Sequence, residues 1–186
     1  MVKQILLVVC WMTSLIGAAQ DYIQPGLLVG EATFSPSTML NRNVQNFYLS
    51  GNLEYFTDKK VSFKGQSHLF LNGNDPSAIF EQRVMTYFGA MYHFNRSNWD
   101  QHIGFSPGVT VTQSGIHNED GNRYPLMVNP SFAVEVGTTY FVWKYFNFFA
   151  RVTYLNAKLS GTLLENHRTD ELMISAGLGF QVPTRK

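Results

Sequence analysis

Hydrophobic and polar residues alternate along most of the chain, and residues 129–142, NPSFAVEVGTTYFV, show the pattern clearly. In an extended strand Phe132 and Val134 point to one side of the sheet, whereas Glu135 points to the other. Similar period-two segments recur, and no helix-period segment competes with them. We therefore predict eight strands, at about residues 26–36, 45–57, 60–72, 82–95, 99–112, 126–142, 145–158 and 171–182.

The segments between these strands alternate between short and long. The short ones surround Asp58, Arg96 and Trp143, and the longer, polar ones cover about residues 37–44, 73–81, 113–125 and 159–170. This alternation is typical of an up-and-down barrel whose two ends differ. We predict an all-β fold, an eight-stranded antiparallel transmembrane β-barrel.

The short turns restrict the strand registers, because facing residues must lie on the same side of the sheet. Each predicted hairpin combines an aromatic pair outside with a polar pair inside, and such cross-strand pairs contribute about 0.2–1 kcal/mol each. The predicted aromatic girdle pairs are Tyr55 with Phe63, Phe94 with Trp99, and Tyr140 with Phe146. The predicted lumen pairs are Glu54 with Lys64, His93 with Asp100, and Glu135 with Arg151.

The polar face carries both charge signs and many glycines, which suits a narrow interior. Its other polar members include Glu31, His68, Arg83, His102 and Asn147. An eight-stranded barrel is just wide enough for its own side chains, so we expect a packed polar plug without open conduction. A soluble, lipocalin-like carrier has the same period with an oily cavity, and that alternative stays open.

Residues 1–19 are predicted to be a cleaved signal peptide, with a lysine, an apolar segment and small residues up to Ala19. Residues 20–186 then form the barrel domain. Cys10, the only cysteine, lies in the leader, so the mature chain has no thiol. Charged residues make up 15% of the chain, against about 25% in average soluble domains. The net charge of +1 gives no reason to expect a nucleic-acid partner.

The last predicted strand, LMISAGLGFQV, contains Gly177, Phe180 and Val182. It resembles the C-terminal signal that the outer-membrane assembly machinery reads. The whole mature chain resembles the small outer-membrane barrels of diderm bacteria, of the OmpA transmembrane-domain and OmpX type. The resemblance implies a monomer in the outer membrane among lipid and lipopolysaccharide, with termini and short turns in the periplasm. It also implies loops that face outward, available to an extracellular ligand, and a structural or adhesive role.

Some barrels of this kind are enzymes that modify lipid A, and that alternative has candidates here. A histidine base would act with a serine and an acidic partner near the outer rim. The candidates are His68, His117, His167, Ser114, Glu119, Asp120, Glu165 and Asp170. No hydrolase motif surrounds them, so we favour a non-enzymatic protein and assign no catalytic residue.

The segment GIHNEDGN offers His117, Glu119 and Asp120 as ligands for a hard cation. We favour a solvated polar loop with Asp-Gly turn chemistry there. The sequence thus leads us to expect no metal site and no cofactor.

Overall fold

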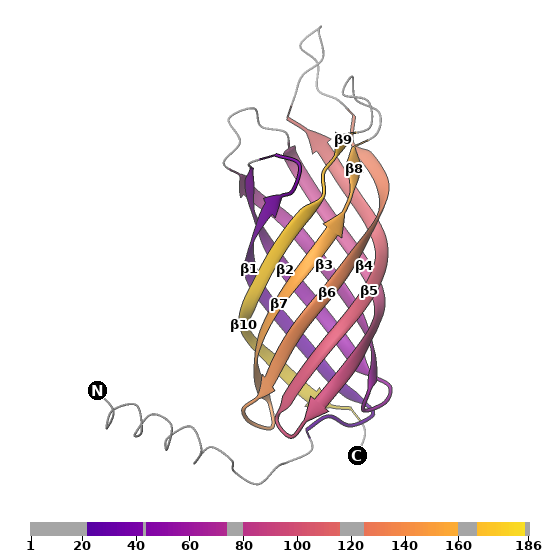
Figure 1. The fold of residues 1–186 in the computed structure, drawn as a ribbon, viewed down its shortest axis with the longest axis vertical. Helices are drawn as coiled ribbons and strands as arrows, with labels where there is room; N and C mark the ends of the chain where they lie inside the picture. The colour runs from indigo at the N-terminus through magenta and orange to yellow at the C-terminus, as the bar shows by residue number, and fades with distance from the viewer. Residues whose placement is uncertain (1–21, 43, 74–79, 116–124, 160–166, 185–186) are drawn as a thin grey trace, which may run out of the picture.

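The computed structural model describes residues 22–42, 44–73, 80–115, 125–159 and 167–184. Eight long antiparallel strands close into a barrel in the order β1-β10-β7-β6-β5-β4-β3-β2, with β1 paired to both β2 and β10 (Figure 1). Their bounds are β1 (Leu27–Met39), β2 (Gln45–Phe56), β3 (Val61–Gly73), β4 (Phe80–Arg96), β5 (Trp99–Ser114), β6 (Met127–Phe141), β7 (Phe146–Asn156) and β10 (Glu171–Pro183). The predicted fold class is confirmed. In the described part of the chain, no helix is long and apolar enough to cross a membrane.

The two ends of the barrel differ. The start of β1, the end of β10 and the connections β2–β3, β4–β5 and β6–β7 lie at one end, called the turn end (Figure 1). The other end, called the loop end, carries the four remaining connections. The last of these contains an unpredicted two-stranded ribbon of β8 (Lys158–Leu159) and β9 (His167–Arg168).

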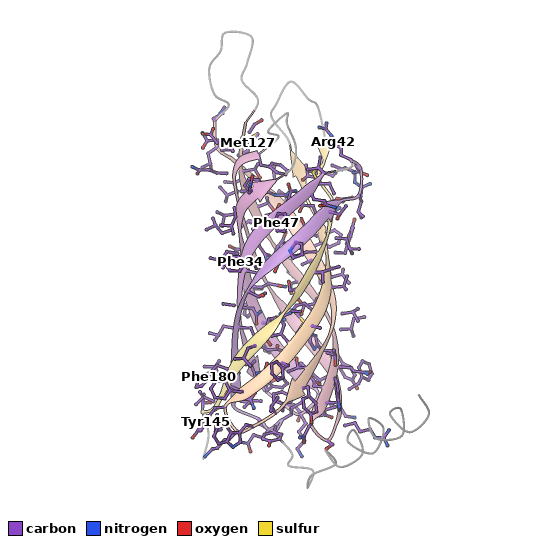
Figure 2. All side chains as sticks on the ribbon, turned by 90° about the vertical axis from the view of Figure 1, so that its left-hand side faces the viewer. Phe34, Arg42, Phe47, Met127, Tyr145 and Phe180 are labelled. Carbon is purple, nitrogen blue, oxygen red and sulfur yellow. The ribbon has the colours of Figure 1, made fainter. Side chains whose placement is uncertain are left out.

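The alternation predicted from the sequence places the apolar side chains outside. Glu135 is 1% exposed, whereas its neighbour Val136 is 56% exposed. Phe105 and Phe148 are each 55% exposed on the outer face. Figure 2 shows further aromatic side chains, such as that of Phe34, projecting from the outer surface. The apolar side of these strands faces outward and the ionic side faces inward, which is the opposite of a carrier with an oily cavity.

Apolar side chains also close the interior at both ends, which the sequence pattern did not predict. At the turn end, Ile23 lies before β1 and packs with residues of β1, β2 and β6; the buried members are Ile23, Leu27, Val29, Phe56 and Phe141. At the loop end, the buried members are Met39, Val44, Phe80 and Met127. The buried charges therefore lie between two apolar layers. They share the interior with a third group of buried apolar side chains: Tyr48, Met85, Tyr87, Ala133, Leu155 and Met173.

The register of the first short turn is the predicted one. Tyr55 lies opposite Phe63, and Glu54 lies opposite Lys64. The connecting residues are held by the Lys60 amide, which donates to Asp58 Oδ1 at 3.0 Å.

The register predicted for the second turn is wrong by two residues. Trp99 lies opposite Arg96 instead of Phe94, and His93 lies opposite His102 instead of Asp100. A two-residue loop replaces the predicted four-residue one, because Ser97 adopts a positive φ of 58°. A positive φ matches the twist of a tight hairpin, and the sequence lacks the glycine that usually signals it.

The register predicted for the third turn is also wrong by two residues. Tyr140 lies opposite Phe148 instead of Phe146, so that Arg151 faces Gly137 and Glu135 faces Thr153. The loop is longer than predicted, because the amides of residues 142 and 143 both donate to the carbonyl of residue 146, at 3.1 and 3.3 Å. A shift of two residues keeps every side chain on its predicted face.

Candidate functional site

The barrel interior holds the strongest concentration of ionisable groups in the described chain. One group, called the turn-end cluster, lies above the apolar layer at that end. Its members are Glu31, Glu54, Lys64, His93, Asp100, His102, Glu135 and Arg151. All are buried, so each charge depends on protein partners for its stability.

Glu135 is the hub of this cluster. Lys64 Nζ donates to Glu135 Oε1 at 2.5 Å, His102 Nε2 lies 3.2 Å from the same oxygen, and Thr153 donates to Oε2 at 3.3 Å. The predicted partner Arg151 is further away, at 3.7 Å, and forms its closest ion pair with Glu31. Glu135 on β6 thus pairs mainly with Lys64 on β3, which is not a neighbouring strand.

His93 continues the network towards the turns. Its Nδ1 lies 2.7 Å from Asp100 Oδ2, although the two residues are not direct cross-strand partners. Its Nε2 lies 3.0 Å from Glu54 Oε1 and 2.8 Å from Ser62 Oγ. The imidazole therefore joins two carboxylates that come from different hairpins.

A second group, called the loop-end cluster, consists of Ser37, Tyr48, Arg83, Thr169 and Glu171. Arg83 forms a fully buried ion pair with Glu171, and its Nη2 donates to Thr169 at 3.3 Å. The Tyr48 hydroxyl donates to Glu171 Oε1 at 3.0 Å, and Ser37 donates to Oε2 at 2.5 Å. These contacts link β4, β10, β2 and β1 across the interior.

The glycines of the interior face make room for these large side chains. A Cβ on Gly137 would lie 2.6 Å from His102 Nε2, and a Cβ on Gly89 would lie 2.1 Å from the Phe105 carbonyl oxygen. Both distances are too short for real carbon atoms. Gly137 therefore leaves the space that the His102 ring occupies on the facing strand.

The predicted girdle residues lie near the turn end on the outer face. Trp99 contacts Tyr140 instead of Phe94, with ring centroids 4.7 Å apart. Phe146 contacts Phe180 of β10, with centroids 5.8 Å apart. Figure 2 places Phe180 at the turn end of the molecule.

Those candidates for lipid A chemistry that the structure describes do not gather into one site. His68 is buried, and its Nδ1 lies 2.8 Å from Ser50 Oγ in the interior. His68 faces Met85, which pairs with Thr110. Ser114 is four residues further along β5, or about 13 Å of strand.

The other candidates within the described residues do not form such a site either. The Asp170 carboxylate accepts a hydrogen bond from Asn156 Nδ2 at 2.9 Å and forms an ion pair with Arg168 at 3.3 Å. The backbone of His167 belongs to β9. Four sequence candidates lie outside the described residues: His117, Glu119, Asp120 and Glu165. The first three are also the possible cation ligands of the segment GIHNEDGN, for which we favour a solvated polar loop. The signal peptide predicted for residues 1–19 also lies outside the described residues.

Sequence reasoning missed the contacts that cross the barrel. Lys64 with Glu135, and Arg83 with Glu171, join strands that are not adjacent. In the sequence, the only indication of these contacts is that each residue occupies an inward-facing position of its strand. Tyr48 and Glu171 occupy such positions and were not assigned a role.

No protein-family model matches this sequence, and no curated protein matches it. Solved structures do match. Neisserial surface protein A superposes with a TM-score of 0.61 at 14% identity, covering 84% of this chain and 96% of that chain. The outer membrane protein OprG from Pseudomonas aeruginosa gives a TM-score of 0.58 at 11% identity, covering 87% and 98%.

The N-terminal β-barrel domain of Pseudomonas aeruginosa OprF gives a TM-score of 0.53 at 14% identity, covering 86% of this chain and 98% of that domain. At these identities the likeness is one of fold. This chain is therefore an eight-stranded antiparallel barrel similar to those of bacterial outer-membrane and surface proteins.

Proposed function

We propose that this chain is a monomeric, non-enzymatic protein of the bacterial outer membrane, whose barrel is a closed scaffold for its surface loops. The observation that carries the proposal is the separation of the two faces: hydrocarbon side chains cover the outside, and the charged side chains of the strands are paired inside. Exposed examples at different levels are Phe34, Phe88, Phe105, Val128, Val136 and Ile174. A soluble protein would leave this contiguous apolar surface in water at a large cost.

The interior supports a barrel that does not conduct. The turn-end and loop-end clusters bridge strands across the lumen, and an apolar layer closes each end. A conducting pathway would require separation of buried ion pairs such as Lys64 with Glu135, which costs several kcal/mol per pair. In planar lipid bilayers we expect no stable conductance steps. Reproducible steps would contradict the closed interior.

The orientation that we propose puts the termini and short turns in the periplasm and the loop end outside. The likeness to outer-membrane barrels and the difference between the two ends support this proposal (Figure 1). We further propose insertion by the assembly machinery, contact with lipopolysaccharide, and a role in envelope integrity or adhesion.

Single cysteines test location and orientation together, because the only natural cysteine is Cys10. Asn41→Cys lies in the loop-end connection β1–β2, and Asp58→Cys is its matched control in the turn-end connection β2–β3. A maleimide that does not cross membranes should label only Asn41→Cys on intact cells and both variants after lysis. Equal labelling on intact cells, or release of the protein in the soluble fraction, would contradict the proposal.

The scaffold role itself is tested by deletion of the gene and complementation. Loss of the chain should increase detergent sensitivity or decrease attachment of cells to a surface, and restored expression should reverse the change. If the deletion instead changes the mass spectrum of lipid A, and His68→Ala fails to restore it, the enzyme alternative is correct. If neither cell property changes, the scaffold role is wrong.

A further inference from the structure

Three buried side chains of the turn-end cluster converge on a common point. His93 and His102 lie directly opposite each other on β4 and β5, with ring centroids 5.6 Å apart, and Asp100 precedes His102 by two residues. One ligand atom from each residue lies within 4.8 Å of the other two. We propose that these three residues bind a divalent transition-metal ion inside the barrel, with Zn²⁺ as the expected ion. This site goes beyond the proposed scaffold function and does not depend on it.

The hydrogen bonds around the two imidazoles match those of metal ligands. Each ring turns its Nδ1 towards Asp100, at 2.7 Å for His93 and 3.7 Å for His102. Each ring places its Nε2 against another carboxylate: Glu54 at 3.0 Å from His93, and Glu135 at 3.2 Å from His102. Metal-binding histidines characteristically donate their second N–H to a carboxylate, which fixes the ring and increases its basicity.

Two atoms of these three residues lack a hydrogen-bond partner in the protein. They are Asp100 Oδ1 and His102 Nδ1, and both are buried. An unsatisfied buried polar atom costs about 1–3 kcal/mol. His102 Nδ1 faces Asp100 Oδ2 at 3.7 Å, and Asp100 Oδ1 is the second oxygen of the same carboxylate, so one ion bound by the three residues would give both unpartnered atoms a partner.

Apart from its histidines, the turn-end cluster has two more negative than positive side chains. Its four carboxylates, from Glu31, Glu54, Asp100 and Glu135, face two permanent cations, Lys64 and Arg151. The remaining charge of two can be balanced by one divalent ion or by protons on both histidines. The two solutions differ in metal content, which makes them distinguishable by experiment.

The donor set selects the type of ion. Two imidazole nitrogens and one carboxylate suit Zn²⁺ and related transition ions better than Ca²⁺ or Mg²⁺, which prefer oxygen. Zinc ligands bond at about 2.0–2.2 Å, so neighbouring ligand atoms are about 3.3 Å apart in a tetrahedral site. The separations of Asp100 Oδ2 from the two Nδ1 atoms, 2.7 Å and 3.7 Å, lie on either side of that value, and a fourth ligand would come from the second oxygen of Asp100 or from water.

The test uses the purified full barrel in detergent. The protein is unfolded in urea with a chelator and refolded with Co²⁺, whose visible absorption reports nitrogen and oxygen ligands. We expect about one Co²⁺ per folded barrel, displaced by Zn²⁺. Asp100→Asn and His102→Gln should weaken the affinity by about 100-fold or more, and Glu54→Gln by about 10- to 100-fold as an outer carboxylate. His68→Gln is the matched control, because it removes another buried imidazole without touching the site.

Heat-dependent gel migration first shows which variants are folded. A folded wild-type barrel that refolds normally and takes up no Co²⁺ would overturn the proposal, and the protons on His93 and His102 would then balance the charge. The proposal also fails if His68→Gln loses the metal to the same extent as Asp100→Asn. Loss confined to the variants of the three ligands and their carboxylates would support it. None of these outcomes bears on the cysteine labelling that tests membrane location.

Discussion

Glu135→Gln is expected to destabilise the barrel by about 3 kcal/mol, mainly through the loss of its contact with Lys64. The two side chains are each 1% exposed, and their charged atoms are 2.5 Å apart. At an effective dielectric constant of about 20, Coulomb's law gives roughly 7 kcal/mol of attraction at this distance. Desolvation of both groups cancels much of that gain, and breaking such a buried pair costs about 3–5 kcal/mol. His102 and Arg151 also lose an interaction with Glu135. A loss of only about 3 kcal/mol, at the lower end of that range, therefore assumes that the neighbouring side chains rearrange around the new glutamine.

A double-mutant cycle identifies the partner. Combining Glu135→Gln with Lys64→Met removes both charges, so the double variant should recover about 2 kcal/mol of the sum of the single losses. The matched cycle with Arg151→Met should recover less than about 1 kcal/mol, because Arg151 lies 3.7 Å from Glu135 and pairs more closely with Glu31.

The assay is equilibrium unfolding by urea in lipid vesicles, followed by tryptophan fluorescence and checked by gel migration with and without heating. Additive losses for Lys64 and Glu135, within about 0.5 kcal/mol, would refute the assignment. A larger coupling to Arg151 than to Lys64 would show that the direct hairpin pairing predicted from the sequence describes the protein better than the structure does.

Two further substitutions test the close packing of the strands and the apolar outer face. Gly89→Ala should lower the urea midpoint of unfolding clearly, because the new Cβ would lie 2.1 Å from the Phe105 carbonyl oxygen. Gly30→Ala is the control and should have a small effect, because the nearest atom to its new Cβ lies at 3.8 Å. Equal midpoints for the two variants would contradict the close packing at Gly89. Phe105→Arg should cost about 2–4 kcal/mol in vesicles, against about 0–1 for Gln101→Arg near the turn end, and similar losses would show that the lipid boundary is elsewhere.

The sequence was sufficient to predict the fold and the facing of side chains because both depend on the same period of two. Glu135 and Val136 are adjacent in the chain, yet Glu135 is buried in the interior and Val136 is exposed on the outer face, as their alternation predicts. Closure of the barrel followed from the number of strands and the lengths of their connections. The apolar layer around Phe56 and Phe141 was not predictable in this way, because those residues occupy inward-facing positions of their strands but are apolar, whereas most inward-facing residues are polar.

The registers depend on the turns, which the sequence describes weakly. Ser97 adopts a positive φ, which a glycine at this position would have indicated in the sequence, and the register of the hairpin differs from the predicted one by two residues. The shift leaves each face intact while it changes every neighbour along the pair. That is why His93 and His102 face each other, and why a contact between His93 and Asp100 forms diagonally, although the direct pairing predicted for it is wrong.

Pairing across the lumen is a property of the closed barrel and not of any hairpin. Lys64 lies opposite Glu54 in its own hairpin, but its nitrogen reaches Glu135 on β6. The choice is physical, because Glu54 is already bonded to His93 and Ser62, whereas Glu135 offers Lys64 an oxygen that it shares with only one imidazole at hydrogen-bond distance. Charges in a narrow interior therefore distribute themselves over all the strands at one level, and a sequence that specifies only adjacent pairs leaves that distribution open.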